Sequence, residues 1–279
     1  MSPSTSLRAL AVAAFATLLV GCVGTDVAEP RDTAGGDADT DTDTDTDTDT
    51  DTDAPTDRLA LGSATDGAFT VEAWADEEPH VGLNRVGYRV LDASGGPVDG
   101  LTVTHAPWME MEDMGHACPF TTPSPAGGGW YESEVVFLMG GAWTDTVTVS
   151  DGATSSEHTF AVEVEQTNFG TIVTVGDASW FVAFDLAAEP AVGANPFVLT
   201  VHAMQDAANF PEVADLQVVV DPSMPSMGHG SEGNVDPVYV GAGVYAGTVV
   251  FSMGGPWEVR FTLSGGDGTE VEVTFEVEV

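Results

Sequence analysis

Basic side chains are scarce in this sequence, and lysine is missing altogether. The 279 residues include six arginines against 45 Asp and Glu residues, which gives a formal net charge of −39 at pH 7. Proteins hold nucleic acids and acidic lipid surfaces largely through Lys and Arg. We therefore expect no nucleic-acid partner and no attraction of the folded part to acidic lipids.

Cysteines, long apolar runs and catalytic motifs are also scarce. The only cysteines are Cys22 and Cys118, so no disulfide framework supports the fold, and hydrophobic cores must stabilise it. Beyond the N-terminus no apolar run reaches the roughly 18 residues that cross a bilayer. The sequence contains no Gly-x-Ser-x-Gly, no His-Glu-x-x-His and no glycine loop followed by lysine. We expect that the protein is not an enzyme.

The N-terminus predicts export. Arg8 precedes an apolar run over residues 10–20, which is too short to span a bilayer and is typical of a secretory signal peptide, here residues 1–21. The run ends in Leu19-Val20-Gly21-Cys22, which resembles a bacterial lipobox. That resemblance implies that Cys22 is acylated, and Val23 is not the aspartate that retains lipoproteins at the inner membrane. We expect a lipid-anchored protein of the bacterial cell envelope, held at the outer membrane and facing the periplasm or the surface.

Residues 22–58 form the next segment, in which Asp and Thr alternate over 39–53. A segment without apolar side chains cannot offset the entropy lost on ordering. Charges on every second residue repel one another and extend the chain. We expect a disordered acidic stalk between the anchor and the folded part.

The rest of the chain is a tandem duplication. Pro107-Trp-Met-Glu-Met-Glu-Asp-Met-Gly-His116 returns as Pro222-Ser-Met-Pro-Ser-Met-Gly-His229, and Tyr131–Trp143 returns as Tyr245–Trp257. A unit of about a hundred residues has the size of a whole domain rather than of a solenoid repeat. We predict two homologous domains, 59–168 and 174–279.

Short runs with period two predict an all-β fold. Gly and Pro clusters separate them, and no segment shows a useful helical period. Six or seven strands in about a hundred residues are typical of an immunoglobulin-like β-sandwich. In the first copy the runs are 69–74, 86–90, 101–104, 134–137, 144–149 and 159–164.

The repeated Met and His residues are candidate metal ligands. In an extended segment, residues two apart share a face, so Met227 should project with His229, and Met114 with His116. Thioethers and imidazoles favour Cu(I) over zinc or calcium. Alternatively, the methionines fill gaps between sheets and Gly-His forms a turn. The predicted ligands are Met224, Met227 and His229 in the second copy and Met109, Met114 and His116 in the first.

Other residues near these motifs have less distinctive patterns. Cys118 is either an additional soft ligand or a tolerated thiol. Met139 and Met253 are expected to pack at the core or its rim. Trp143 and Trp257 should close the sandwich end, with the indole N–H bonded at the rim. Four histidines are unmatched between the copies and receive no site role: His80, His105, His158 and His202.

The order Gly-x-Asn, Met-Pro-x-Met-Gly-His, and Gly-x-Tyr-x-Gly through Met-Gly-Gly-x-Trp resembles the YtkA-like domain and is similar to the periplasmic part of FixH-type proteins. The second copy fits closely. The first departs from the pattern with Glu110 in place of the inner proline and two extra residues before Met114. The resemblance implies an immunoglobulin-like sandwich and copper handling. The expected function is binding Cu(I), or delivering it to a copper-receiving protein; the alternative is a non-catalytic structural or partner-binding module without metal.

Overall fold

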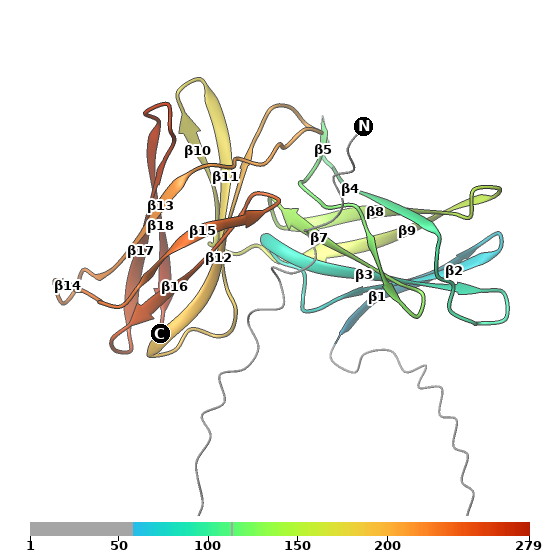
Figure 1. Cartoon of the computed structure of the whole chain (residues 1–279), viewed down its shortest axis with the longest axis horizontal. Coiled ribbons are helices and arrows are strands. Elements are labelled where there is room, and N and C mark those ends of the chain that lie inside the picture. The colour runs from blue at the N-terminus through green and yellow to red at the C-terminus, as the bar shows by residue number, and fades with distance from the viewer. Residues whose placement is uncertain (1–57, 113) are drawn as a thin grey trace, which may run out of the picture. The chain divides into compact units, whose positions relative to one another are not determined.

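The computed structural model describes residues 58–279 apart from residue 113, and every regular element among them is a β-strand. The described residues belong to one compact unit, drawn in colour in Figure 1. The predicted signal peptide, Cys22 and the Asp/Thr run lie outside the described residues. Within the described part of the chain, no helix is long and apolar enough to cross a membrane.

The first copy forms two antiparallel sheets, with strand orders β1-β2-β3-β7-β6 and β5-β4-β8-β9. Its strands are β1 (Leu59–Asp66), β2 (Phe69–Ala75), β3 (Gly82–Asp92), β4 (Thr102–Glu110), β5 (Gly115–Ala117), β6 (Ser124–Gly127), β7 (Trp130–Phe137), β8 (Gly141–Ser150) and β9 (Ser155–Val164).

The second copy repeats this topology with every strand label raised by nine: β10-β11-β12-β16-β15 and β14-β13-β17-β18. The predicted all-β architecture of two tandem immunoglobulin-like sandwiches is confirmed. Its strands are β10 (Gly170–Val175), β11 (Ala178–Leu186), β12 (Gly193–Ala203), β13 (Gln217–Met224), β14 (His229–Gly230), β15 (Val235–Gly241), β16 (Val244–Phe251), β17 (Pro256–Ser264) and β18 (Glu270–Glu278).

Alternating burial makes the central strands the walls of the two cores. In β4 and β9 every second residue is buried, as a half-buried strand requires. Trp143 and Trp257 are among the largest buried side chains, and their indole N–H groups donate to the carbonyls of Met139 (3.1 Å) and Met253 (3.0 Å). The predicted packing of both indoles, with the N–H bonded, is confirmed.

The Gly-x-Asn and tyrosine motifs have structural roles. Asn195 is buried, and its side-chain amide donates to the carbonyls of Ala191 and Gly193, which fixes the turn into β12. Asn84 does the same in the first copy. The hydroxyl of Tyr245 donates to the carbonyl of Val213 and so anchors the segment before β13. These motifs therefore hold the sandwich together and leave the Met/His phrases as the candidates for chemistry.

One polar network lies inside the first core. The hydroxyl of Tyr88 donates to Asp145 Oδ2 (2.5 Å) and lies 2.7 Å from His105 Nδ1, while Nδ1 lies 3.4 Å from the same carboxylate oxygen. Burial, reinforced by the charge of Asp145, raises the pKa of Tyr88 well above its usual value, so the phenol stays protonated and donates. Asp145 Oδ1 is buried without a hydrogen-bond partner.

The second core is apolar at the same three positions. Strand pairing defines the equivalences: Tyr88 pairs with Tyr131 as Leu199 pairs with Tyr245. By the same registers, Val220 corresponds to His105 and Val259 corresponds to Asp145. All three residues of the second copy are buried. The fold thus accepts either a polar network or an aliphatic cluster at this place.

Candidate metal centre

Each copy places a methionine and a histidine opposite each other across a short hairpin. Met109 of β4 pairs with His116 of β5, and Met224 of β13 pairs with His229 of β14. Directly opposed residues in an antiparallel pair have their Cβ atoms about 4.5–5.5 Å apart. The chain reversal therefore brings together a thioether and an imidazole seven residues apart in the first copy and five apart in the second.

Both histidines have the same ring nitrogen occupied. His116 Nδ1 lies 2.8 Å from the carbonyl oxygen of Ala117, and His229 Nδ1 lies 3.0 Å from that of Gly230. A carbonyl can only accept a hydrogen bond, so Nδ1 carries the proton in each ring. In a neutral imidazole this leaves the lone pair on Nε2, which is the arrangement found in metal-binding histidines.

A second methionine lies beside this lone pair. In the first copy His116 Nε2 is 3.4 Å from Met139 Sδ. An ion held about 2.3 Å from sulfur and about 2.0 Å from nitrogen, the bond lengths of a zinc site, separates two such donors by roughly 3.6 Å at a tetrahedral angle. The two atoms are therefore spaced as ligands of one ion would be.

The tryptophan and the paired glycines complete the arrangement. The ring of His116 meets the edge of Trp143 at 5.1 Å between centroids, and His229 meets Trp257 at 5.8 Å. A Cβ on Gly255, whose φ is +121°, would lie 3.5 Å from the Cε methyl of Met224. The glycine supplies a backbone conformation that side chains disfavour, next to the terminal methyl of the buried methionine.

The two copies thus present the same set of groups. Met109 and Met224 are buried, whereas Met139 and Met253 are 39% and 40% exposed. The set is one buried thioether, one imidazole and one exposed thioether beside an indole. Sequence reasoning missed the approach of Met139 to His116, because only the fold brings its turn against the hairpin; Met253 is the equivalent residue of the second copy. The sequence feature that could have indicated these two methionines is that each directly precedes Gly-Gly in its copy.

Met114 and Met227 lie in the hairpin turns and are 63% and 60% exposed. The expectation that Met227 shares a face with His229 is wrong in its premise, since the segment is not extended. The backbone N–H groups of Met227 and Gly228 both donate to the carbonyl of Met224, and Gly228 has a φ of +66°. The residue opposite His229 is Met224.

Cys118 is buried in the first core. Burial, followed by the charge of Asp145, raises the pKa of its thiol well above the usual value. A protonated, buried thiol is a poor ligand, so this position favours the tolerated-thiol interpretation. Among the described residues no three His, Cys, Asp or Glu side chains are grouped as a metal site. The donors that do converge are thioethers and imidazoles.

Comparison with protein families gives one match, repeated along the chain. The family model described as YtkA-like matches residues 63–148 and 174–262, one segment in each sandwich. No protein of the curated set is significantly similar in sequence.

Several solved structures are distantly similar. A copper-bound variant of FetP from uropathogenic Escherichia coli is 14% identical over 40% of this chain and 90% of its own, with a TM-score of 0.29. The Escherichia coli adhesin FdeC is 15% identical over 75% of this chain and 64% of its own, with a TM-score of 0.27. The Yersinia pseudotuberculosis adhesin InvE is 12% identical over 72% and 55%, with a TM-score of 0.23. The chain spans less than two thirds of both adhesin structures.

Proposed function

The chain belongs to the YtkA-like family, and we propose that it is a lipid-anchored extracytoplasmic protein that binds Cu(I) in each domain and passes it to a copper-receiving partner. The observation that carries the proposal is the 3.4 Å approach of His116 Nε2 to Met139 Sδ, with the lone pair of Nε2 left free by the bond from Nδ1. The second copy repeats the backbone bond and the neighbouring groups.

The donor set favours Cu(I) over other ions. Two thioethers and one imidazole are soft to borderline ligands, whereas calcium and magnesium require oxygen donors and Cu(II) favours nitrogen and oxygen in a tetragonal arrangement. The net charge of −39 also concentrates cations around the protein. The ligand set thus selects the ion, and the charge raises its local concentration.

Exposure of one ligand is consistent with delivery rather than storage. Met139 and Met253 are partly exposed, and the turn thioethers of Met114 and Met227 are more exposed still. A partner's donor can therefore approach the ion from the solvent side while the buried methionine and the histidine still hold it. Transfer by stepwise ligand exchange requires such an open side.

Titration with Cu(I) in the presence of a competing chelator tests the proposal. The full chain is expected to retain two equivalents of Cu(I) and to show no comparable affinity for Zn(II). The variant His116→Phe/His229→Phe removes both imidazoles while leaving rings that can pack on the tryptophans, and it should retain none. A wild-type chain that retains no Cu(I) would instead support the alternative, a structural or partner-binding module without metal.

The lipid anchor makes a separate prediction. Cys22→Ala is expected to move the protein from the washed membrane fraction into the soluble fraction, because each buried methylene of an acyl chain contributes about 0.8 kcal/mol and an acidic body adds no affinity for lipid. Fractionation followed by immunoblotting measures this, with Val23→Ala as the matched control. An alanine variant at position 22 that stays with the membranes would contradict the acylation.

A further inference from the structure

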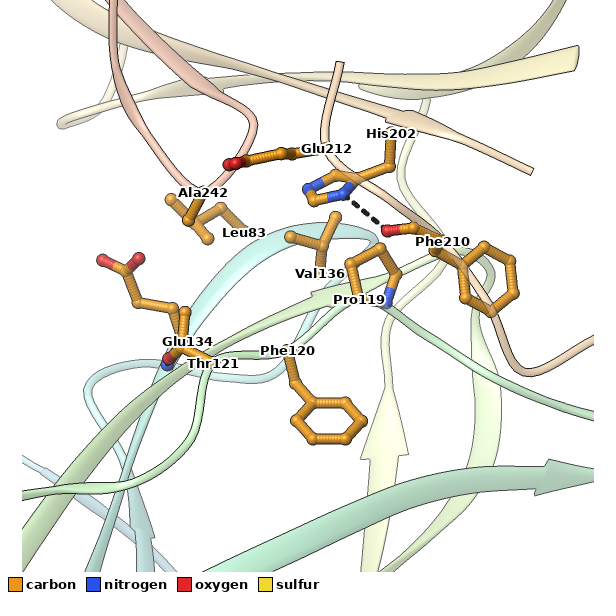
Figure 2. Close-up of a pocket in the computed structure, with 10 residues that line it drawn as sticks. All are labelled: Leu83, Pro119, Phe120, Thr121, Glu134, Val136, His202, Phe210, Glu212 and Ala242. Atoms are coloured by element: carbon orange, nitrogen blue, oxygen red, sulfur yellow. Dashed lines mark hydrogen bonds between the residues drawn. The ribbon is translucent and has the colours of Figure 1, made fainter. Parts of the chain in front are cut away.

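A pocket that contains none of the candidate copper ligands is lined by residues of the two sandwiches. Its volume is about 210 Å³, and it lies within the compact unit Pro55–Val279. Figure 2 shows the lining side chains. Leu83, Phe120 and Val136 provide much of the apolar wall, together with Pro119 and Phe210. The pocket is large enough for a small organic molecule and too apolar on this wall to favour a bare ion.

His202 places an unpartnered acceptor at this pocket. The side chain is only 5% exposed, and its Nδ1 lies 3.1 Å from the carbonyl oxygen of Phe210, to which it donates. Burial lowers the pKa of His202, so the ring is neutral and Nε2 carries a lone pair. Nε2 is buried without a hydrogen-bond partner in the described structure. A buried acceptor of this kind is stabilised by a ligand that brings a donor.

Gly243 packs directly against Nε2, at a position where only glycine fits. A Cβ on Gly243 would lie 2.7 Å from His202 Nε2, closer than real side chains approach. Gly243 has a φ of +77°, which also favours glycine. The chain therefore covers Nε2 on this side with a residue that has no side chain to bond it.

The titratable groups that line the pocket are acidic or neutral. Glu212 Oε2 accepts a hydrogen bond from the hydroxyl of Tyr239 (2.7 Å). Glu134 Oε1 lies 3.7 Å from Nε of Arg85, a residue that does not line the pocket. Each carboxylate can still accept further hydrogen bonds, because it has a second oxygen and additional lone pairs. The lining contains no Lys or Arg. The pocket therefore presents acceptors and negative charge to a ligand.

We propose that this pocket binds a small organic ammonium ion with an apolar body. A primary ammonium brings a positive charge and N–H donors to a pocket whose polar lining groups are acceptors: Glu134, Glu212 and His202 Nε2. The hydrocarbon part packs against Leu83 and Val136. This inference is independent of the proposed copper sites.

Binding of benzylammonium and benzyl alcohol to the full chain tests the charge requirement. The two probes share their shape and differ in the cationic group. In ¹H–¹⁵N correlation spectra, benzylammonium is expected to shift the amide signals of Leu83, Val136 and Gly243 in a saturable way, with at least about tenfold tighter binding than benzyl alcohol, or roughly 1.4 kcal/mol. Glu134→Gln/Glu212→Gln should abolish that difference, and His202→Phe should weaken benzylammonium without changing the net charge.

A matched variant excludes general attraction to an acidic surface. Glu157→Gln/Glu163→Gln removes the same charge from the exposed face of β9 and should leave benzylammonium binding unchanged. Equal effects of the two double variants would overturn the proposal, as would equal binding of the two probes or an absence of saturable shifts at these amides. Shifts produced by Zn(II) alone and by neither organic probe would identify a metal site instead and would also overturn it.

Discussion

Substituting valine for Asp145 alone is expected to lower the free energy of unfolding of the first sandwich by about 1–3 kcal/mol. The carboxylate is buried, accepts the hydroxyl of Tyr88 and lies within 3.4 Å of His105 Nδ1. Its removal takes away the carboxylate that accepts the Tyr88 hydroxyl and leaves the phenol with His105 Nδ1 as its one remaining partner, and a buried polar group that loses a partner destabilises the fold.

The triple variant Tyr88→Leu/His105→Val/Asp145→Val is expected to be far more stable than the single variant and close to the wild type. It installs the residues that the second copy carries at the same register, namely Leu199, Val220 and Val259. Replacing an entire buried polar cluster by well-packed apolar residues is often neutral or stabilising. The contrast between one substitution and three isolates the cost of an incomplete network from the cost of lost volume.

Native-state hydrogen exchange of the β4 and β8 amides measures both effects in the first sandwich, whereas a whole-chain melt would mix the two domains. Glu157→Val, on the exposed face of β9, is the control for loss of a carboxylate and should change stability by about 0.5 kcal/mol or less. A triple variant as unstable as the single one would show that the polar groups are required by the fold of this copy.

Much of the fold could be predicted because burial follows a period of two. The runs at 69–74, 144–149 and 159–164 lie within β2, β8 and β9, whose inner residues are buried in strict alternation over most of their length. Strand β1 was not predicted, because most of its residues are exposed and it has no alternating pattern to read. The short strands β5 and β6 lack it as well. Periodicity therefore identified the strands that build the cores and missed the peripheral ones.

Contacts between distant residues could not be read from spacing. Tyr88, His105 and Asp145 are 17 and 40 residues apart along the chain, and only the packing of one sheet on the other brings them together. In so acidic a chain no single aspartate stands out by composition. His202 has no counterpart of its own type in the first copy, so comparison of the repeats gave it no role, although it lines the pocket in Figure 2.

Only the part of the candidate site that lies within one hairpin could be predicted from the sequence. Met224 and His229 are close in sequence and are joined by one hairpin, so a local motif reveals both. Met253 lies far from this hairpin in sequence, in the turn between β16 and β17, where its carbonyl accepts the Trp257 N–H. Met227 looked like a ligand because its spacing from His229 fits an extended chain, whereas the chain turns at Gly228.

Substitutions of Met253 and of Met227 are expected to change the Cu(I) affinity of the second site very differently. The first site is disabled by His116→Phe/Met139→Leu, so that only the second site is measured. In this background Met253→Leu should weaken Cu(I) binding by at least about 100-fold. Loss of a residue that only hydrogen-bonds to a metal ligand already weakens metal binding by about 10–100-fold, and loss of a ligand should cost more. Met227→Leu should leave the affinity within about threefold, or roughly 0.6 kcal/mol. Leucine conserves the volume of methionine and removes the sulfur, so the fold is retained.

Competition titrations on both variants, with circular dichroism to verify the β-sheet content, measure this difference. Met224→Leu is the positive control, because Met224 is buried opposite His229 and supplies the inner thioether of the proposed set. If Met227→Leu abolished binding and Met253→Leu did not, the turn would have to rearrange on loading to bring Met227 to the ion. The ligand set would then be the one that sequence spacing predicts, and the approach of sulfur to imidazole seen between Met139 and His116 would be a packing contact.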